Sequence, residues 1–458
     1  MTDKVVQEYR CTSCGGQMQF DPEAQALVCR DCGEQAEERV GAKKGGDEGE
    51  CLAMATDGLT CPNCGAQMEK LTGANQTSCE FCGSTFSVFS EGEDCPILGE
   101  IPENHRYVIP FAVSEDEYKR KMISNLAAET AMPLDAFDKM AMIRSAEAYY
   151  IPHYLCIASY QVNWTASIGY DRIETYTVYE NGKAVTRTRI VTDWRPGSGR
   201  ASGRVGMSCA ANAFPDDSLA KAEAANGEKR RKDVSSCSGG RRHVPAAFAS
   251  SPGTMPQGVK EMDTKYTAGL EMLSCDIPAQ NSYDKNFTHD QIRRAIERDA
   301  PGDRIRNLRF NGNIVPDYSL IYIPAWVSVY SYKDTVCINF ADGTAAEGSH
   351  TGTRPVDRKI KRRARKFYIP GILSGILLII AFIVGMTEAD FETMAFIDEA
   401  LPTLGIVTAA LLILGFIGAK IFYGKKTKKL QKAAESYLAN PSKLFGRKSA
   451  KPDPLRRE

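Results

Sequence analysis

The sequence lacks the short motifs that mark the common nucleotide-dependent and hydrolytic enzymes. It contains no GxxxxGKS/T phosphate loop, no HExxH pair and no GxSxG elbow, which excludes P-loop NTPases, zincin-type metalloproteases and hydrolases built on that elbow. Histidine is also scarce, with five dispersed residues. The sequence therefore predicts no catalytic residue and no organic cofactor. An enzyme with an unrecognised site near His153 or Trp326 is an alternative, although a packed core is the simpler interpretation of these two residues.

The chain also lacks a net charge and an N-terminal apolar leader. Lys and Arg together number 57, and so do Asp and Glu, which implies no bulk attraction to nucleic acid. Met1–Arg10 is polar and charged, so we expect no signal peptide and a cytoplasmic N-terminus. Because thiols stay reduced in the cytoplasm, clustered cysteine pairs there indicate metal binding rather than disulfides.

A duplicated cysteine pattern stands out near the N-terminus. Two CxxC pairs with fourteen residues between them occur twice, and CPNCGAQM repeats CTSCGGQM fifty residues later. Each pair folds as a tight knuckle that directs two thiolates at one point, and two knuckles make a tetrahedral four-cysteine cage. Since protein fills all four positions, we expect two structural Zn²⁺ ions; tetrathiolate iron has the same spacing. The predicted ligands are Cys11, Cys14, Cys29 and Cys32 in ribbon 1 (residues 1–40), and Cys61, Cys64, Cys79 and Cys82 in ribbon 2 (residues 60–95), with a glycine-rich linker at 41–59.

Both predicted ribbons are acidic. Met1–Val40 has four basic and eight acidic residues, and Thr60–Cys95 has one basic and five acidic residues. Affinity for nucleic acid comes mainly from neutralising phosphates with cations, so these ribbons would repel a duplex. We therefore expect a protein partner or a structural capping role, with nucleic-acid binding as the alternative.

Two long apolar runs lie near the C-terminus. Phe367–Met386 and Leu401–Tyr423 each reach the roughly 20 residues that a helix needs to cross about 30 Å of hydrocarbon. Neither contains an acidic residue, and the one basic residue, Lys420, lies where its stem can snorkel. Thr387–Glu399 connects them, so the sequence predicts a transmembrane helical hairpin at 367–386 and 401–423. Two core helices of a soluble protein are the alternative.

The charges beside these runs predict their orientation. Arg358–Lys366 has seven basic residues and five lysines open the tail at 424–458, whereas the connection has five acidic residues and no basic one. Basic flanks stay on the cytoplasmic side, so we expect a multi-pass cell-membrane protein with both termini in the cytoplasm. We interpret the basic clusters as topology signals; binding of anionic lipid headgroups is the alternative.

The region between the ribbons and the apolar runs is predicted to be α+β. The expected elements are a strand at Tyr107–Val113, a helix capped by Ser114, a helix at Leu134–Ala146, a strand at Tyr149–Trp164 and a hairpin turning at Asn181-Gly182. YIPHYL at Tyr150 matches YIPAWV at Tyr322, which indicates a duplicated unit with halves at 101–194 and 261–354. Each proline is expected at a strand start or edge. Residues 195–260 are rich in Gly, Ser, Ala and charge and are predicted to be a mobile insertion.

These features together are similar to a known group. The two CxxC ribbons, the VIPF segment at Val108, the IPHYL and IPAWV strands and the apolar hairpin resemble uncharacterised bacterial membrane proteins with a transcription-factor-IIB-type double zinc ribbon. The resemblance covers most of the chain and implies zinc at the eight cysteines, but no activity. Some members carry labels that suggest a primosomal helicase, which does not fit a chain without a phosphate loop. The sequence thus predicts a multidomain, membrane-anchored, cytoplasmic zinc-binding protein that acts by protein interaction, as an adaptor or assembly factor.

Overall fold

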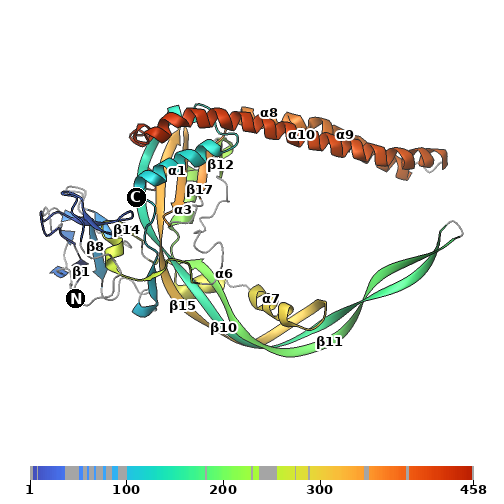
Figure 1. Ribbon diagram of the computed structural model, residues 1–458, viewed down its shortest axis with the longest axis horizontal. Coiled ribbons are helices and arrows are strands. Elements are labelled where there is room, and N and C mark those ends of the chain that lie inside the picture. Colours follow the sequence, from blue (N-terminus) through green and yellow to red (C-terminus); the bar gives the residue numbers. More distant parts are fainter. Residues whose placement is uncertain are drawn as a thin grey trace. The chain divides into compact units, whose positions relative to one another are not determined.

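The structure is a computed structural model (Figure 1). It divides the chain into two compact units. It describes residues 4–7, 9–36, 51–54, 59–60, 67–68, 76–78, 85–90, 101–180, 183–227, 231–236, 255–273, 275–286, 289–344, 350–387 and 391–455. Unit 1 comprises residues 1–112, 149–213 and 244–324, and unit 2 comprises residues 113–148, 214–243 and 325–458. Each unit is assembled from segments that are distant in sequence, so the division differs from the predicted halves at 101–194 and 261–354.

The N-terminal part of unit 1 contains a hairpin and a small sheet. In the hairpin, β2 (Met18–Asp21) pairs antiparallel with β3 (Ala26–Cys29). The sheet has the order β4-β1-β8-β7, and β5 pairs with β6 alone. These strands are β1 (Lys4–Gln7), β4 (Cys51–Met54), β5 (Leu59–Thr60), β6 (Gln67–Met68), β7 (Gln76–Ser78) and β8 (Thr85–Ser90). β1 pairs with β4, from the predicted linker, on one side and with β8, from predicted ribbon 2, on the other. The two predicted ribbons are therefore not separate domains.

The largest feature of unit 1 is a long two-stranded ribbon. β10 (Met140–Glu180) and β11 (Lys183–Ala210) pair antiparallel from His153 opposite Ala210 to Glu180 opposite Lys183 (Figure 1). The two-residue connection at 181–182 confirms the hairpin predicted there, although those two residues lie outside the described ones. The structure corrects the insertion predicted at 195–260. Its first part is the second half of β11, and Phe214–Ala225 forms α3; residues 237–254 lie outside the described part of the chain.

Glycine explains why β11 does not look like a strand in the sequence. Gly199 lies opposite Trp164, and Gly203 lies opposite Tyr160. A Cβ atom at Gly199 would be 2.8 Å from Trp164 Cζ2, and one at Gly203 would be 2.9 Å from the Tyr160 hydroxyl oxygen. The large rings of β10 therefore occupy the space above glycines of β11, which is a known way of stabilising glycine in sheets.

The rest of unit 1 supports this ribbon. The helix α7 (Asp290–Asp299) buries Ile292 and Ile296 in one cluster with Tyr160 and Trp164 of β10. β15 (Arg304–Tyr332) lies next to β10 in the sheet order. The remaining elements of unit 1 are β9 (Arg106–Val108), β13 (Lys260–Glu261), η4 (Thr264–Thr267), β14 (Glu271–Met272) and α6 (Ala279–Asn286).

Pro152 and Pro324 lie inside β10 and β15, not at a strand start as expected. On β10, the pairing with β14 ends at Tyr150 and the pairing with β11 begins at His153. On β15, the pairing with β9 ends at Tyr322 and the pairing with β16 (Thr335–Asp342) begins at Ala325. Each proline therefore lies, on one side of its strand, between the end of one ladder and the start of the next, a position compatible with its missing N–H.

Unit 2 is a sheet with helices on both faces. Its strands are the end of β15 (from residue 325), β16, β17 (His350–Pro355) and β12 (Val234–Ser236). On one face, Tyr118 of α1 (Glu115–Ala128) stacks on Trp326 at 5.5 Å. On the other, Phe214 of α3 meets Phe340 edge-on at 6.2 Å. The helix predicted at Leu134–Ala146 shrinks to α2 (Ala136–Lys139), because Met140 already begins β10.

The helix α1 follows its sequence pattern closely. Ser114 Oγ accepts a hydrogen bond from the Glu117 backbone N–H at 3.4 Å, as the capping motif predicts. The predicted stripe of Tyr118, Met122, Ile123 and Leu126 is buried. Local capping and the 3.6-residue period were therefore sufficient to define this helix.

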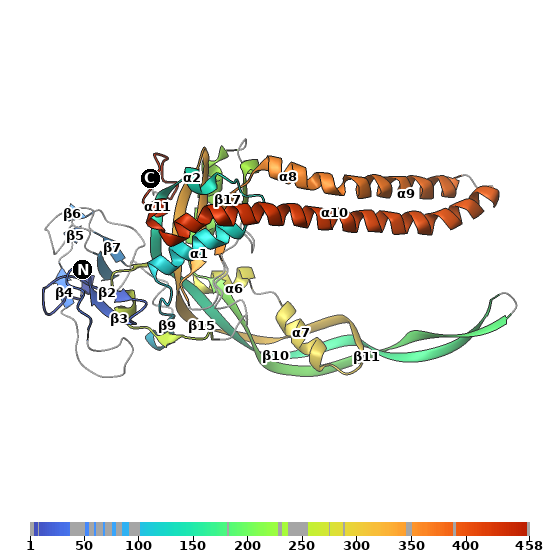
Figure 2. The same ribbon diagram turned by 45° about the horizontal axis from the view of Figure 1, so that its top comes forward.

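The C-terminal helices belong to unit 2. They are α8 (Arg358–Arg365), η5 (Lys366–Tyr368), α9 (Ile369–Thr387), α10 (Phe391–Ala439) and α11 (Ser442–Phe445), and Figure 2 shows α9 beside α10. α10 continues sixteen residues past the predicted end at Tyr423. The predicted tail is therefore folded: Leu430 and Ala434 are buried, and the Tyr437 hydroxyl donates to Asp138 Oδ1 at 2.8 Å.

Candidate metal centre and membrane helix

The four cysteines predicted for ribbon 1 meet in one cluster. All their sulfur atoms lie within 4.8 Å of one another. Cys11 Sγ is 3.5 Å from Cys32 Sγ, and Cys14 Sγ is 3.4 Å from Cys29 Sγ. Four thiolates at this spacing could hold one metal ion tetrahedrally, with Zn–S distances of about 2.3 Å. Because Cys11 and Cys29 are buried while Cys14 and Cys32 are exposed, an ion would be covered on one side by the ribbon.

The backbone of each knuckle explains why glycine follows the cysteines. Gly15 and Gly33 adopt positive φ angles of 72° and 76°, which a residue with a Cβ atom adopts only with strain. In each knuckle this glycine donates its N–H to the carbonyl of the first cysteine, at 2.9 Å for Cys11 and 3.0 Å for Cys29. The Cys32 backbone N–H lowers the pKa of the Cys29 thiol to about 7, whereas the pKa of the other three thiols of the cluster is raised. Cys29 is therefore the member most readily present as the thiolate that binds metal.

The cluster lies on a hairpin that is packed into unit 1. Phe20 on β2 is 1% exposed and meets the ring of Tyr266 edge-on at 5.5 Å. The Phe20 N–H donates to the Ala268 carbonyl at 3.0 Å. A metal ion at the cluster would thus fix a hairpin that contacts η4 and the turn after it.

The structure is informative about one of the two predicted four-cysteine sites. Cys61, Cys64, Cys79 and Cys82 lie outside the described residues, so the second site stays a prediction. Among the described cysteines elsewhere, Cys156, Cys209, Cys275 and Cys337 are buried and not in disulfides. Burial raises the pKa of Cys156 to about 12, as is typical of an inert core thiol.

His153 and Trp326, the residues considered for an enzyme site, both lie in packed surroundings. His153 is 5% exposed, with its Nδ1 atom 3.3 Å from the Ile151 carbonyl. Trp326 Nε1 donates to the Val113 carbonyl at 2.9 Å. A depression of about 290 Å³ in unit 1 is bordered by Ser159, Gln161, Ser202, Arg204 and Asn313, among others, and no described residue lining it is acidic, histidine or cysteine.

The membrane candidate is a helix of unit 2. Within the described part of the chain, the segment Pro402–Ala439 of α10 is long and apolar enough to cross a membrane, and only 11% of its most apolar stretch is buried. Ile406, Ile413 and Leu414 are among its exposed side chains. Since exposed apolar surface costs about 25 cal/mol per Å² in water, the exposure favours lipid over water, and it does not fit the alternative of a buried core helix.

Comparison with known proteins gives no relative for this chain. No family model, no curated protein and no solved structure matches it. The resemblance to bacterial double-zinc-ribbon membrane proteins therefore stays a prediction, and the function has to be argued from the residues themselves.

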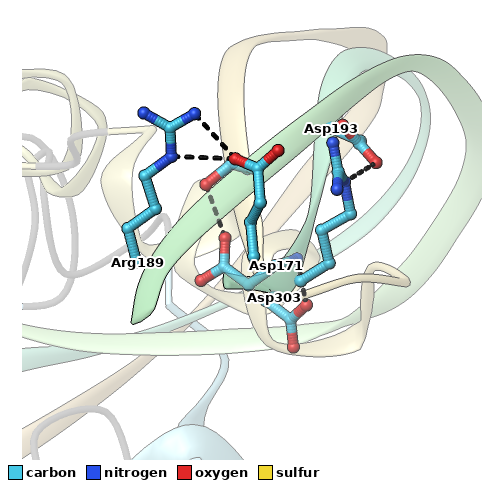
Figure 3. A network of polar contacts seen from close by, with 7 residues as sticks. Asp171, Arg189, Asp193 and Asp303 are labelled. Carbon is cyan, nitrogen blue, oxygen red and sulfur yellow. Dashed lines mark hydrogen bonds and ion pairs between the residues drawn. The ribbon is translucent and has the colours of Figure 1, made fainter. Parts of the chain in front are cut away.

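The structure also presents a surface that sequence reasoning missed. Along the outer part of β10 and β11, one face carries paired charges: Arg189 Nη2 is 2.7 Å from Glu174 Oε2, and Arg172 Nε is 3.0 Å from Asp193 Oδ2 (Figure 3). On the opposite face, Asp171 accepts a hydrogen bond from Thr192 Oγ1 at 2.6 Å.

Between Asp171 and the hairpin connection, the other face of the two-stranded ribbon carries no charged residue. Side chains alternate between faces along a strand, so cross-strand pairs such as Ile173 with Ile190 share this face. We call it the uncharged ribbon face: Ile173, Thr175, Thr177 and Tyr179 of β10, with Ala184, Thr186, Thr188 and Ile190 of β11. Ile173 is 75% exposed, Tyr179 77% and Ile190 64%. The signal in the sequence was the period-2 alternation of threonines and isoleucines on both sides of Asn181-Gly182.

Proposed function

We propose that this chain is a membrane-anchored cytoplasmic zinc-binding protein that acts by protein interaction, as an adaptor or assembly factor. The closed four-cysteine cluster carries the proposal, because four protein thiolates leave no open position where a metal could activate water or substrate. The zinc is then structural, and a second structural zinc is held by Cys61, Cys64, Cys79 and Cys82. The four acidic residues by which ribbon 1 exceeds its basic ones favour a protein over a nucleic acid.

The anchor consists of two antiparallel helices, α9 and α10, with both termini in the cytoplasm. Ser374 Oγ lies 2.7 Å from Thr408 Oγ1 across the pair, a polar contact of the kind that joins helices in lipid. A Cβ atom on Gly371 would be 2.6 Å from Leu412 Cδ2, so the helices approach closely at a glycine. Both contacts support a packed hairpin, and the acidic connection supports its orientation.

The uncharged ribbon face supports an interaction role. Its exposed Ile173, Tyr179 and Ile190 side chains, with the threonines between them, form an apolar and hydroxyl-bearing row, and exposed apolar surface of this kind favours a protein-binding role. The charges of the opposite face already satisfy one another. The uncharged face is therefore where we expect the protein partner to bind.

Site-specific photo-crosslinking in membranes tests this function. A photo-reactive residue at Ile173 or Ile190 is expected to capture one discrete protein, and the same residue at Arg187, on the opposite face, is the matched control. Pre-treatment with a zinc chelator shows whether capture needs the metal. Equal adducts from both faces, or adducts to nucleic acid whose yield falls steeply as salt rises, would contradict the adaptor role.

A further inference from the structure

The helix α8 has one face packed on the protein and one face covered with cations. Ile360 and Ala364, four residues apart on one face, are buried. Ile360 clusters with Ala131 and Val356, and Phe422 and Tyr423 of α10 pack against this cluster. α8 is therefore held against α10 by its apolar face, which leaves its basic residues directed outward.

These contacts place α8 beside the end of the apolar part of α10. Phe367 lies against Gly415, since a Cβ there would be 2.5 Å from the Phe367 carbonyl. Phe422 and Tyr423 pack against the cluster that contains Ile360. The two contacts together define an antiparallel register, in which Arg362–Lys366 runs alongside the last apolar turns of α10. Figures 1 and 2 both show α8 next to α10. The cations thus lie where an apolar helix surface gives way to a charged one.

We define the basic collar as the exposed cations beside the last apolar turns of α10 together with those on the α10 turns that follow. It consists of Arg362, Arg363, Arg365 and Lys366, with Lys425, Lys428, Lys429 and Lys432 of α10. None of the eight has an ion-pair partner among the residues that the structure describes. By contrast, Arg358, one turn earlier, pairs with Asp233 at 2.6 Å. Next to the collar, burial and then the charges of Arg354 and Arg365 lower the pKa of Lys361.

We propose that the basic collar binds the phosphate groups of anionic phospholipids, a proposal that rests on the proposed membrane anchor. Eight exposed cations, held on neighbouring helices without an ion-pair partner among the described residues, attract anions from outside the chain. Their continuity with the exposed apolar surface of α10 puts them at the depth where lipid phosphates lie. A topology signal alone does not need its cations to be held on a helix that packs against α10 through the Ile360 cluster, and this favours a binding surface over the simpler interpretation.

Full-length protein in nanodiscs provides the test. One set contains phosphatidylcholine alone and the other includes phosphatidylglycerol, and native mass spectrometry counts the anionic lipids that stay bound. The triple variant R362Q/R363Q/R365Q removes three collar cations. It leaves the five lysines that follow the apolar part of α10 in place, so the topology signal there is kept. R187Q/R189Q/R195Q, on the outer ribbon, removes the same charge as a matched control. At about 1 kcal/mol per cation near the membrane, the collar variant is expected to bind phosphatidylglycerol roughly 100-fold more weakly, and the control to bind it as the natural chain does.

The other possible outcomes distinguish failure of the lipid site from failure of the membrane anchor. If the collar variant retains the same phosphatidylglycerol, or the control loses as much, the lipid site is wrong while the anchor stands. If the unaltered chain shows no lipid preference but binds a DNA duplex that the collar variant does not, the collar serves nucleic acid. If the natural chain is washed from membranes by alkaline carbonate, the anchor itself fails, and with it the proposed function.

Discussion

Replacing Cys29 by serine should uncouple the first ribbon from the rest of unit 1. Cys29 is the last residue of β3 and is 2% exposed. Without metal, the hairpin would depend on a small core in which Met18, Phe20 and Leu27 are the large buried side chains. At about 1.5–3 kcal/mol each, these contribute less than the roughly 10–16 kcal/mol that a structural zinc supplies.

Two measurements on the full-length protein check this. Elemental analysis is expected to show one metal equivalent fewer in Cys29→Ser than in the natural chain. Hydrogen exchange is expected to show lost protection across residues 9–36, including the Phe20 amide that donates to Ala268. Protection of α1, in unit 2, should be unchanged.

A rescuing variant separates ligand loss from simple misfolding. Cys32→His keeps a metal ligand in a set of three cysteines and one histidine, which zinc accepts, and Cys32 is exposed enough to take the larger ring. This variant should retain the metal equivalent and the protection. If Cys29→Ser keeps its metal and a protected Phe20 amide, the cluster is not a structural metal centre and the reasoning is refuted.

Three further predictions concern stability. Burial lowers the pKa of His350 to about 4. Between pH 6.5 and 4 the unfolded chain therefore binds more protons than the folded one, so the unfolding free energy falls by about 3 kcal/mol as pH drops through that window. His350→Phe should flatten this pH dependence, measured by denaturant titrations at each pH. Glu129→Gln should cost about 3 kcal/mol of unfolding free energy by the same assay, because it removes the carboxylate charge 2.8 Å from Arg354, whose side chain is 9% exposed; a loss below about 0.5 kcal/mol would contradict this. Gly199→Val should cost about 1–3 kcal/mol by overpacking against Trp164, seen as faster hydrogen exchange in β11, and unchanged exchange would argue against that close approach.

Sequence reasoning succeeded where the physics is local. The CxxC spacing brought Cys11, Cys14, Cys29 and Cys32 together because each knuckle is closed by its own glycine. The cap at Ser114 defined α1, and Asn181-Gly182 defined the hairpin connection. It failed where neighbours distant in sequence decide the conformation. The glycines of β11 are strand residues only because Trp164 and Tyr160 fill the space above them.

By itself, the sequence determined the four-cysteine cluster of the first ribbon and the apolar character of the C-terminal helices, since both depend on residue type and short spacing. Only the tertiary structure decided how the segments combine. It showed β1 in one sheet with β4 and β8, and α8 packed beside α10 through the Ile360 cluster. The physical reason is that strand pairing and helix packing are settled by partners far along the chain, which spacing within one segment does not specify.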